Sequence, residues 1–393
     1  MNKFTHLHVH THFSVLDGMS KIDDLISKCK KNGMNAIAIT DHGNMFGVKE
    51  FFNACTKANG GVKSEIKSIE KELKEIEKTD AANQAKINEL QERLSSKKGE
   101  LFKPIIGCEA YCARRTLYDK DKNVKETNPE SGRQYIVDSS GYHLILLAKN
   151  ITGYKNLCKL ISTAWIDGFY SRARIDKNIL EKYHEGLIVS SACLGGEIPQ
   201  LIMAGKIKEA EDSIMWFKNL FGDDYYLEIQ RHKTDKPEGN QEVYLRQQEV
   251  NKVIIELAKK TNTKLIATND VHFVDEEHTE GHDRLICLST GRDLDDPNRM
   301  RYTKQEWLKT PEEMWDIFSD VPEALDNTLE IADKVEFYDI NRGPIMPVFE
   351  IPTDFGTEEE YRQRITHKQL FDEFTQNEKG EVVVSQEEGE EKI

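Results

Sequence analysis

Short apolar runs alternate with helix-like segments along most of the chain. AIAIT (36–40) precedes a helix pattern over 47–59, and the amphipathic KEAEDSIMWFKNLF stands between GLIVSSA and YYLEIQ. Parallel strands need such crossover connections, so the alternation predicts an α/β fold with mostly parallel strands, for which a barrel is the simplest closure. The other strand-like runs are THLHVHTHFS, KPIIGCEAY, HLILLA and KLIATND. After the first of these, Ser20 is expected to cap a helix that Gly33 ends.

Residues 62–98 interrupt this alternation. Two apolar series recur there at spacings of three and four, which predicts an inserted antiparallel helical hairpin with Thr79 and Asp80 between its arms. A solvated spacer and an arm that docks a partner both fit the pattern. The series are Val62, Ile66, Ile69, Leu73 and Ile76, then Ile87, Leu90 and Leu94.

The alternation of strand-like and helix-like segments ends near residue 285. We expect a barrel over 1–285, then a smaller helical region over 286–350 that contains TPEEMWDIF and PEALDNTLEIADKV. Residues 351–393 are charged and of low complexity, which predicts a flexible acidic end. The chain is therefore expected to be part of a longer protein.

Composition bounds the function. A formal net charge of −15 argues against a nucleic-acid binder, although residues 354–393, with twelve acids and five bases, supply −7 of it. The seven scattered cysteines suit reduced thiols better than a disulfide framework. No apolar run can span a bilayer and no secretory signal opens the chain, so we expect a cytoplasmic protein without a membrane partner.

Histidines alternate along the first strand-like run, at His6, His8, His10 and His12. A strand places every second side chain on one face, and a row of imidazoles is hard to explain by core packing. A solvated polar face is the alternative. The turn at Asp17 follows, so His8 and His10 are expected near the end of the strand where barrel enzymes carry their chemistry.

Further metal-competent side chains stand at the ends of the later runs. Imidazole and thiolate favour zinc, whereas carboxylates bridge ions or hold manganese, so together they predict a polynuclear site. Two or more ions suit phosphoryl chemistry, because one activates water while another neutralises the leaving oxygen. These side chains are Asp41, His42, Glu109, His143, Cys193, Asp270 and His272.

The motifs resemble the polymerase and histidinol phosphatase family, whose members open with H-x-H, continue with T-D-H-G and close with D-x-H. HLHVHTHFSVLDG, AITDHGNMFGVKEF, KPIIGCEAY, SSACLGGEIPQ and ATNDVHFV resemble, in order, the N-terminal region of bacterial replicative DNA polymerase III alpha subunits. The resemblance runs from about Lys3 to Val348, interrupted by the hairpin.

This resemblance implies a distorted (β/α)7 barrel that holds three divalent ions, zinc and/or manganese. His6 and His12 match no ligand position and are expected near the ligands or at the surface. Cys193 and Asp17 stand where small phosphatases commonly have histidine, which leaves the metal open. The nine ligands implied are His8, His10, Asp17, His42, Glu109, His143, Cys193, Asp270 and His272.

Two segments are candidates for substrate contact. DGFYSRARID carries Phe169, Tyr170, Arg172 and Arg174, which suit stacking on a terminal base and holding its phosphate, although a packed loop with solvated arginines fits as well. Arg231 follows YYLEIQ and is expected to clamp a phosphate oxygen.

Two other features carry weaker signals. Cys108 and Cys112 have a zinc-knuckle-like spacing, but Cys108 neighbours Glu109 on a strand and should face away from the metals, which favours packing. Asp293 and Asp295 lack the strands of a polymerase palm and are interpreted as loop residues. The resemblance places the polymerase carboxylates beyond this chain.

The leading hypothesis is a metal-dependent 3′–5′ exonuclease that trims DNA 3′ ends for the remainder of a replicative polymerase. A small-molecule phosphomonoesterase or pyrophosphatase would use the same site. The third hypothesis is an inert scaffold that docks a separate exonuclease subunit or other replisome proteins.

Overall fold

The computed structural model describes residues 2–79, 84–127, 134–236 and 238–346, with the short pieces 356–357, 359–360 and 362–363. The α-helices are α1 (Ile22–Lys31), α2 (Val48–Ala58), α3 (Gly60–Thr79), α4 (Gln84–Gly99), α5 (Ile151–Ile166), α6 (Lys177–Lys182), α7 (Glu197–Met203), α8 (Ile207–Phe221), α9 (Gln241–Thr261), α10 (Thr279–Thr290), α11 (Pro311–Ile317) and α12 (Pro322–Lys334). The strands are β1 (Ala36–Ile39), β2 (Lys103–Ala113), β3 (Lys125–Thr127), β4 (Gln134–Ile136), β5 (Gly141–Ala148), β6 (Arg174–Ile175), β7 (Leu187–Ser190), β8 (Tyr225–Gln230) and β9 (Lys264–Thr268).

Contacts divide the chain into two compact units, Met1–Ile340 and Asn341–Ile393. The expected boundary at residue 285 falls inside α10, and residues 286–340 belong to the first unit. Most of the expected acidic end, 351–393, lies outside the described residues. Within the described residues, no helix combines the length and apolar character that crossing a membrane requires.

The main sheet has the order β1-β2-β5-β7-β8-β9, with β6 beside β2. Neighbours are parallel except at β5, which runs antiparallel to both β2 and β7. The described residues between β2 and β5 form no α-helix, and an antiparallel return needs no crossover helix. The expected α/β fold is thus confirmed, with one reversed strand.

The N-terminal segment, residues 4–11, closes the sheet into a distorted barrel. Ala38 N of β1 donates to His6 O at 2.9 Å, and on the other side His10 N donates to Val271 O at 2.7 Å, just beyond β9. The first and last strands of the sheet are therefore joined through this segment.

The expectation of a regular first strand was wrong. Val9 N donates to Thr40 Oγ1 at 2.9 Å, and Thr11 N donates to Asp41 Oδ1 at 2.7 Å. Side-chain oxygens thus replace main-chain carbonyls in the ladder, and only isolated bridges form at Val9 and Thr11. The segment keeps the place of a strand without its regular pattern.

Helix α1 also begins differently from the expectation. Its N-cap is Lys21, without a side-chain hydrogen bond, and the hydroxyl of Ser20 has no partner among the described residues. The end agrees with the expectation, because Gly33 has a φ of 71° just after the helix.

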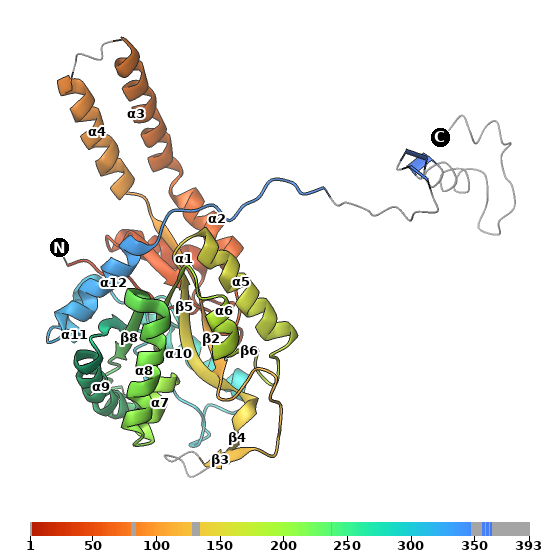
Figure 1. Cartoon of the computed structure of the whole chain (residues 1–393). Helices are drawn as coiled ribbons and strands as arrows, with labels where there is room; N and C mark the ends of the chain where they lie inside the picture. Colours follow the sequence, from red (N-terminus) through yellow and green to blue (C-terminus); the bar gives the residue numbers. More distant parts are fainter. Residues whose placement is uncertain are drawn as a thin grey trace, which may run out of the picture. The chain divides into compact units, whose positions relative to one another are not determined.

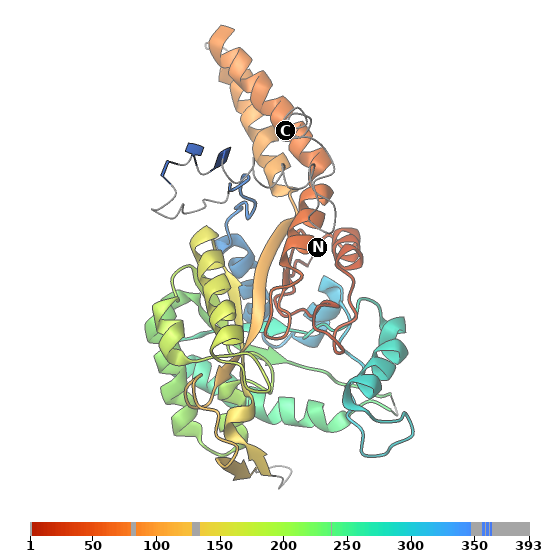
Figure 2. The same ribbon diagram turned by 90° about the vertical axis from the view of Figure 1, so that its right-hand side faces the viewer.

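Two apolar clusters position the site. The larger lies between the sheet and the surrounding helices seen in Figures 1 and 2. The smaller unites inward side chains such as Ile105 of β2 and Ile266 of β9 with Ile331 of α12. Helix α12 therefore packs against the barrel's inner residues. The candidate metal ligands lie farther along the strands.

The expected hairpin is formed by α3 and α4, which extend away from the strands in Figure 1. Lys97 of α4 pairs with Glu65 of α3 at 2.9 Å, which fixes the arms as antiparallel. Ile69 and Leu90 are buried but belong to neither barrel cluster. The seam is therefore satisfied within the hairpin, while Asp80 lies outside the described residues.

Candidate metal centre

Glu109 stands at the middle of a cluster that contains all nine predicted ligands. It shares the inward face of β2 with Ile105, because residues four apart on a strand point the same way, and it is buried. Its carboxylate oxygens lie 3.3 Å from His8 Nε2, 3.9 Å from His10 Nε2, 2.7 Å from His143 Nδ1 and 3.7 Å from Cys193 Sγ, and they also contact His42 Nδ1.

His8, His10 and Asp270 form one group of potential ligands. Asp270 Oδ1 lies 3.1 Å from His8 Nε2 and 3.2 Å from His10 Nε2. These three buried atoms have no hydrogen-bond partner among the described residues. Buried polar atoms are rarely left unpaired, and three that converge at such distances fit a shared cation.

Glu109, His143 and Cys193 form a second group. Cys193 Sγ lies 3.5 Å from His143 Nδ1. His143 stands near the start of β5, and the reversal of β5 brings this start to the carboxyl ends of its neighbours. The direction of this strand therefore explains how a residue at a strand's beginning joins the cluster.

His42, His272 and Asp17 complete the cluster. His42 and His272 form a third group with His10, and the His10 and His42 rings stack at 4.0 Å. Asp17 Oδ2 lies 2.7 Å from His42 Nε2 and 3.7 Å from His272 Nε2. The structure thus brings all nine predicted residues together.

The backbone is strained beside three of these residues. Asp270 has a φ of 45°, Leu16 before Asp17 has 63°, and Ala192 before Cys193 has 61°. Positive φ values are rare for residues other than glycine and cluster at functional sites. The fold therefore pays a local conformational cost where it presents the cluster.

The pKa values of the cluster's buried ionisable groups indicate that it would be stabilised by added positive charge. Burial acts to raise the pKa of Glu109, but His143 and His42 outweigh it and hold the pKa well below its usual range. Burial opposes protonation of His42, yet Glu109 and Asp17 raise its pKa well above 6.5. Burial raises the pKa of the Cys193 thiol, with Glu109 adding to the rise. A bound cation would supply the missing charge and favour the thiolate.

Glu228 of β8 contacts the cluster but was not among the residues predicted from the sequence. Its Oε1 accepts hydrogen bonds from His8 Nδ1 at 2.7 Å and Thr268 Oγ1 at 2.6 Å, and Oε2 accepts from Ser190 Oγ at 2.7 Å. A carboxylate behind a histidine directs the opposite ring nitrogen toward a metal. The alternating pattern of YYLEIQ, with Glu228 facing the same way as Gln230, was the available signal.

Tyr302 was also missed. Its hydroxyl donates to Asp17 Oδ1 at 2.8 Å and lies 3.4 Å from His272 Nε2. Tyr302 belongs to a loop outside every quoted motif, so no local pattern pointed to it.

Asp41 contacts the cluster indirectly, through Ser14. It accepts from Thr11 N at 2.7 Å and from Ser14 Oγ at 2.7 Å, and Ser14 Oγ accepts from His10 Nδ1 at 3.0 Å. Asp41 therefore orients His10 rather than joining the nine.

Two cavities adjoin the cluster. The larger, about 720 Å³, contains Asp17, Phe169 and Arg172, whereas the smaller, about 230 Å³, contains Asp270 and Arg301. His42 and Met300 line both cavities. Both cavities thus border the cluster.

Only part of the predicted substrate loop faces the cluster. Phe169 and Arg172 line the larger cavity, but Tyr170 does not. Arg174 is fully buried in β6, and its guanidinium donates to the carbonyls of Gly168 and Asp138. The expectation that Arg174 binds substrate was wrong, because main-chain oxygens already occupy its donors.

Arg231 is likewise not at the site. Gln230 and His232 line the smaller cavity, and the alternation of an extended chain turns Arg231 to the other side. There it pairs with Asp320 at 2.5 Å and donates to Ile317 O at 2.9 Å. The predicted phosphate clamp is therefore a structural contact.

His6, His12, Cys108 and Cys112 lie outside the nine-residue cluster. His6 is buried and donates through Nε2 to Lys309 O at 2.9 Å, whereas His12 is exposed. Cys108 and Cys112 are buried in the larger apolar cluster, and Cys108 contacts Asp41 O at 3.3 Å.

The sequence of the chain matches the model of a known protein family. The PHP domain model matches residues 6–232 of this chain. The chain therefore belongs to the PHP domain family. The match ends before Asp270 and His272, which the structure brings to the same cluster.

Within that family, the chain is similar to DNA polymerase III alpha subunits. It is 40% identical to the subunit of Borreliella burgdorferi over 93% of this chain and 26% of that protein. It is 34% identical to the subunit of Treponema pallidum over 94% of this chain and 26% of that protein. The chain spans about a quarter of the length of these curated relatives.

Among solved structures, the chain matches a Bifidobacterium adolescentis protein assigned as a metal-dependent phosphoesterase. The TM-score is 0.33 at 12% identity, covering 69% of this chain and 88% of the other.

Proposed function

We propose that the nine-residue cluster holds divalent metal ions and hydrolyses the terminal phosphodiester of a DNA 3′ end. The protein would then be a metal-dependent 3′–5′ exonuclease of a cytoplasmic replicative polymerase. The convergence of unpaired buried atoms from His8, His10 and Asp270 is the observation that carries this proposal.

The donor set fits three ions, zinc and/or manganese, because its imidazole, carboxylate and thiol groups are ligands that these metals accept. Such ions activate water near neutral pH and neutralise charge on a phosphoryl group. The chain's own residues fix the ligands: Glu228 holds His8, Asp41 acts through Ser14 on His10, and Tyr302 holds Asp17.

The larger cavity provides the path for the DNA strand. Phe46, Trp165 and Phe169 form an aromatic row at its wall, with ring centroids 5.8 Å and 5.7 Å apart along the row. Trp165 Nε1 donates to Gly43 O at 2.9 Å, which fixes its ring. Nucleobases stack on such exposed rings, and Arg172 at the same wall suits a backbone phosphate.

Several further partners are proposed from the similarity to DNA polymerase III alpha subunits. The remainder of such a polymerase would grip the duplex, so a chain of net charge −15 would need few DNA contacts of its own. An inert scaffold would instead dock a separate exonuclease subunit or other replisome proteins, and the exposed hairpin of α3 and α4 is the surface that would serve it.

The test uses a 5′-labelled single strand with the full chain in manganese and in zinc. Stepwise shortening from the 3′ end that stops on chelation supports the exonuclease. Hydrolysis of p-nitrophenyl phosphate with an intact oligonucleotide would show a phosphomonoesterase instead. Inactivity on both substrates, with metal bound, would leave the scaffold as the function.

A further inference from the structure

We propose that the smaller cavity binds the terminal nucleotide of the strand, with Arg301 holding phosphate oxygens on that side of the cluster. The inference rests on the proposed function and adds a subsite to it. After cleavage the same cavity would hold a nucleoside monophosphate, so the chemical class of its ligand is a mononucleotide.

Arg301 is a cation for which the described residues provide no hydrogen-bond or ion-pair partner. Its Nε is buried without a hydrogen bond, and no ion pair engages its guanidinium within the described part of the chain. Neighbouring arginines are paired: Arg299 with Asp283 at 2.6 Å, and Arg292 with Asp296 at 3.1 Å. A buried unpaired donor is costly, and the planar fork of arginine matches phosphate oxygens.

The cavity places this arginine beside the potential ligands. Asp270 and His272 line it together with Arg301. A phosphoryl group bound at the cluster within this cavity would therefore lie beside both the candidate metal ligands and the guanidinium. The arginine forms bidentate bonds to phosphate that no metal ligand can supply.

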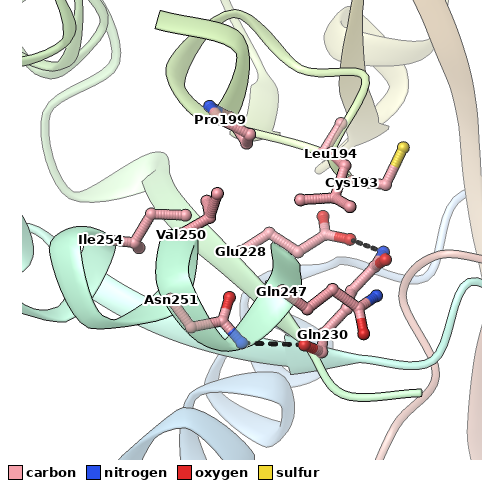
Figure 3. Close-up of a pocket in the computed structure, with 10 residues that line it drawn as sticks. Cys193, Leu194, Pro199, Glu228, Gln230, Gln247, Val250, Asn251 and Ile254 are labelled. Atoms are coloured by element: carbon pink, nitrogen blue, oxygen red, sulfur yellow. Dashed lines mark hydrogen bonds between the residues drawn. The ribbon is translucent and has the colours of Figure 1, made fainter. Parts of the chain in front are cut away.

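The rest of the wall suits a small ligand. Leu194, Val243 and Met300 contribute apolar surface. Gln230 and Gln247, shown together in Figure 3, are fixed: Gln230 Nε2 donates to Glu228 at 2.9 Å, and Gln247 Oε1 accepts from the main chain of the adjacent His232 at 2.8 Å. Apolar surface with a few fixed polar groups is typical of small-molecule sites.

Glu306, an acid in the same cavity wall, does not neutralise the positive charge of Arg301. Glu306 lines the cavity, but Oε1 accepts from Thr303 N at 2.9 Å and from Thr303 Oγ1, and Oε2 accepts from Gln305 N at 2.8 Å. Its charge is thus satisfied by the loop that carries it. Arg301 remains available for an anionic ligand.

Size distinguishes the two cavities. About 230 Å³ is close to the lower end, roughly 300 Å³, of ordinary ligand pockets, so the smaller cavity suits one nucleotide. The larger cavity, about 720 Å³, carries the aromatic row and suits the following nucleotides. Because His42 lines both, the scissile phosphate would lie at the cluster between them.

The test is equilibrium binding of thymidine 5′-monophosphate to the full chain in manganese, by calorimetry, with inorganic phosphate and thymidine as separate probes. We expect the monophosphate to bind more tightly than either probe. Arg301→Ala should weaken monophosphate binding at least tenfold, Arg301→Lys should restore part of it, and both should keep the manganese content of the wild type. Arg292→Ala, a matched charge loss in the same loop, should bind like the wild type.

Equal monophosphate affinity in the wild type and Arg301→Ala would overturn the subsite. Loss of manganese in Arg301→Ala would also overturn it, because the arginine would then act on the cluster rather than on the ligand. Monophosphate binding that depends on Arg301, in a protein that cleaves no DNA, would instead support the subsite and reject the exonuclease.

Discussion

At the scale of single residues, the cluster depends on side chains that never reach the proposed metals. Glu228 accepts hydrogen bonds from His8, Thr268 and Ser190, so its carboxylate is held from several sides. It is a positioning residue for His8. Its removal should therefore affect metal binding more than folding.

We predict that Glu228→Gln weakens metal binding tenfold to about a hundredfold, since outer carboxylates contribute on this order. The amide replaces an acceptor with a donor that faces the hydroxyl of Thr268 or Ser190. Competition with a fluorescent chelator measures the effect. Glu330→Gln, a control that pairs with Lys264 away from the cluster, should bind metal like the wild type. If Glu228→Gln bound metal as tightly as Glu330→Gln, the proposed role of Glu228 would be contradicted.

His6 predicts a dependence of stability on pH. Burial lowers its pKa from 6.5 to about 4. The unfolded state therefore binds the proton first, so the contribution of His6 is complete above pH 6.5 and is lost as pH falls toward 4, by roughly 3 kcal/mol. In chelator, His6→Gln should flatten the fall in unfolding free energy between these values, whereas His12→Gln should not. Parallel curves for wild type and His6→Gln would contradict the assignment.

At the scale of elements, local patterns predicted most helices and strands. Hydrophobic periodicity and the residues that cap or end an element are both read from residues close together in the sequence. The direction of β5 was not predicted, although the lack of a helical pattern between residues 113 and 141 indicates an antiparallel return. The orientations of Arg174 and Arg231 were also missed. Both depend on partners distant in sequence, Asp138 and Asp320.

The hairpin supports a prediction at this scale. Replacing residues 62–98 with a short linker between Gly61 and Gly99 should leave a folded protein, because Ile69 and Leu90 lie outside both barrel clusters. We expect a Tm within a few degrees of the wild type and unchanged metal content, by calorimetry and elemental analysis. Loss of soluble protein would show that the hairpin belongs to the barrel core.

At the scale of the whole molecule, residues 286–340 pack against the barrel and belong to the same compact unit. Tyr302 bonds Asp17, Lys309 O accepts from His6, and Trp315 Nε1 donates to Lys3 O at 2.9 Å. These contacts join residues about 300 positions apart. The nine candidate ligands could be predicted from motifs, but the tyrosine that bonds Asp17 and the arginine of the smaller cavity were found only in the folded chain.

Metals bound at the cluster would reconcile the acidic chain with the proposed phosphate substrate. Asp17, Glu109 and Asp270 concentrate negative charge where metals would reverse it, and Arg172 and Arg301 each line one of the two cavities beside them. DNA affinity should therefore depend on metal more than on surface charge. We propose that the cluster itself cleaves DNA.

That claim is tested most directly by the rate at which wild type, His10→Ala and His12→Ala release the 3′-terminal nucleotide of a mismatched strand in manganese. His10→Ala removes a neutral ligand beside Asp270, so its rate should fall by about two orders of magnitude or more. The barrel should persist with a Tm lowered by less than roughly 10 °C, and exposed His12 should matter little. Equal rates in wild type and His10→Ala would show that the cleavage comes from elsewhere and not from the cluster.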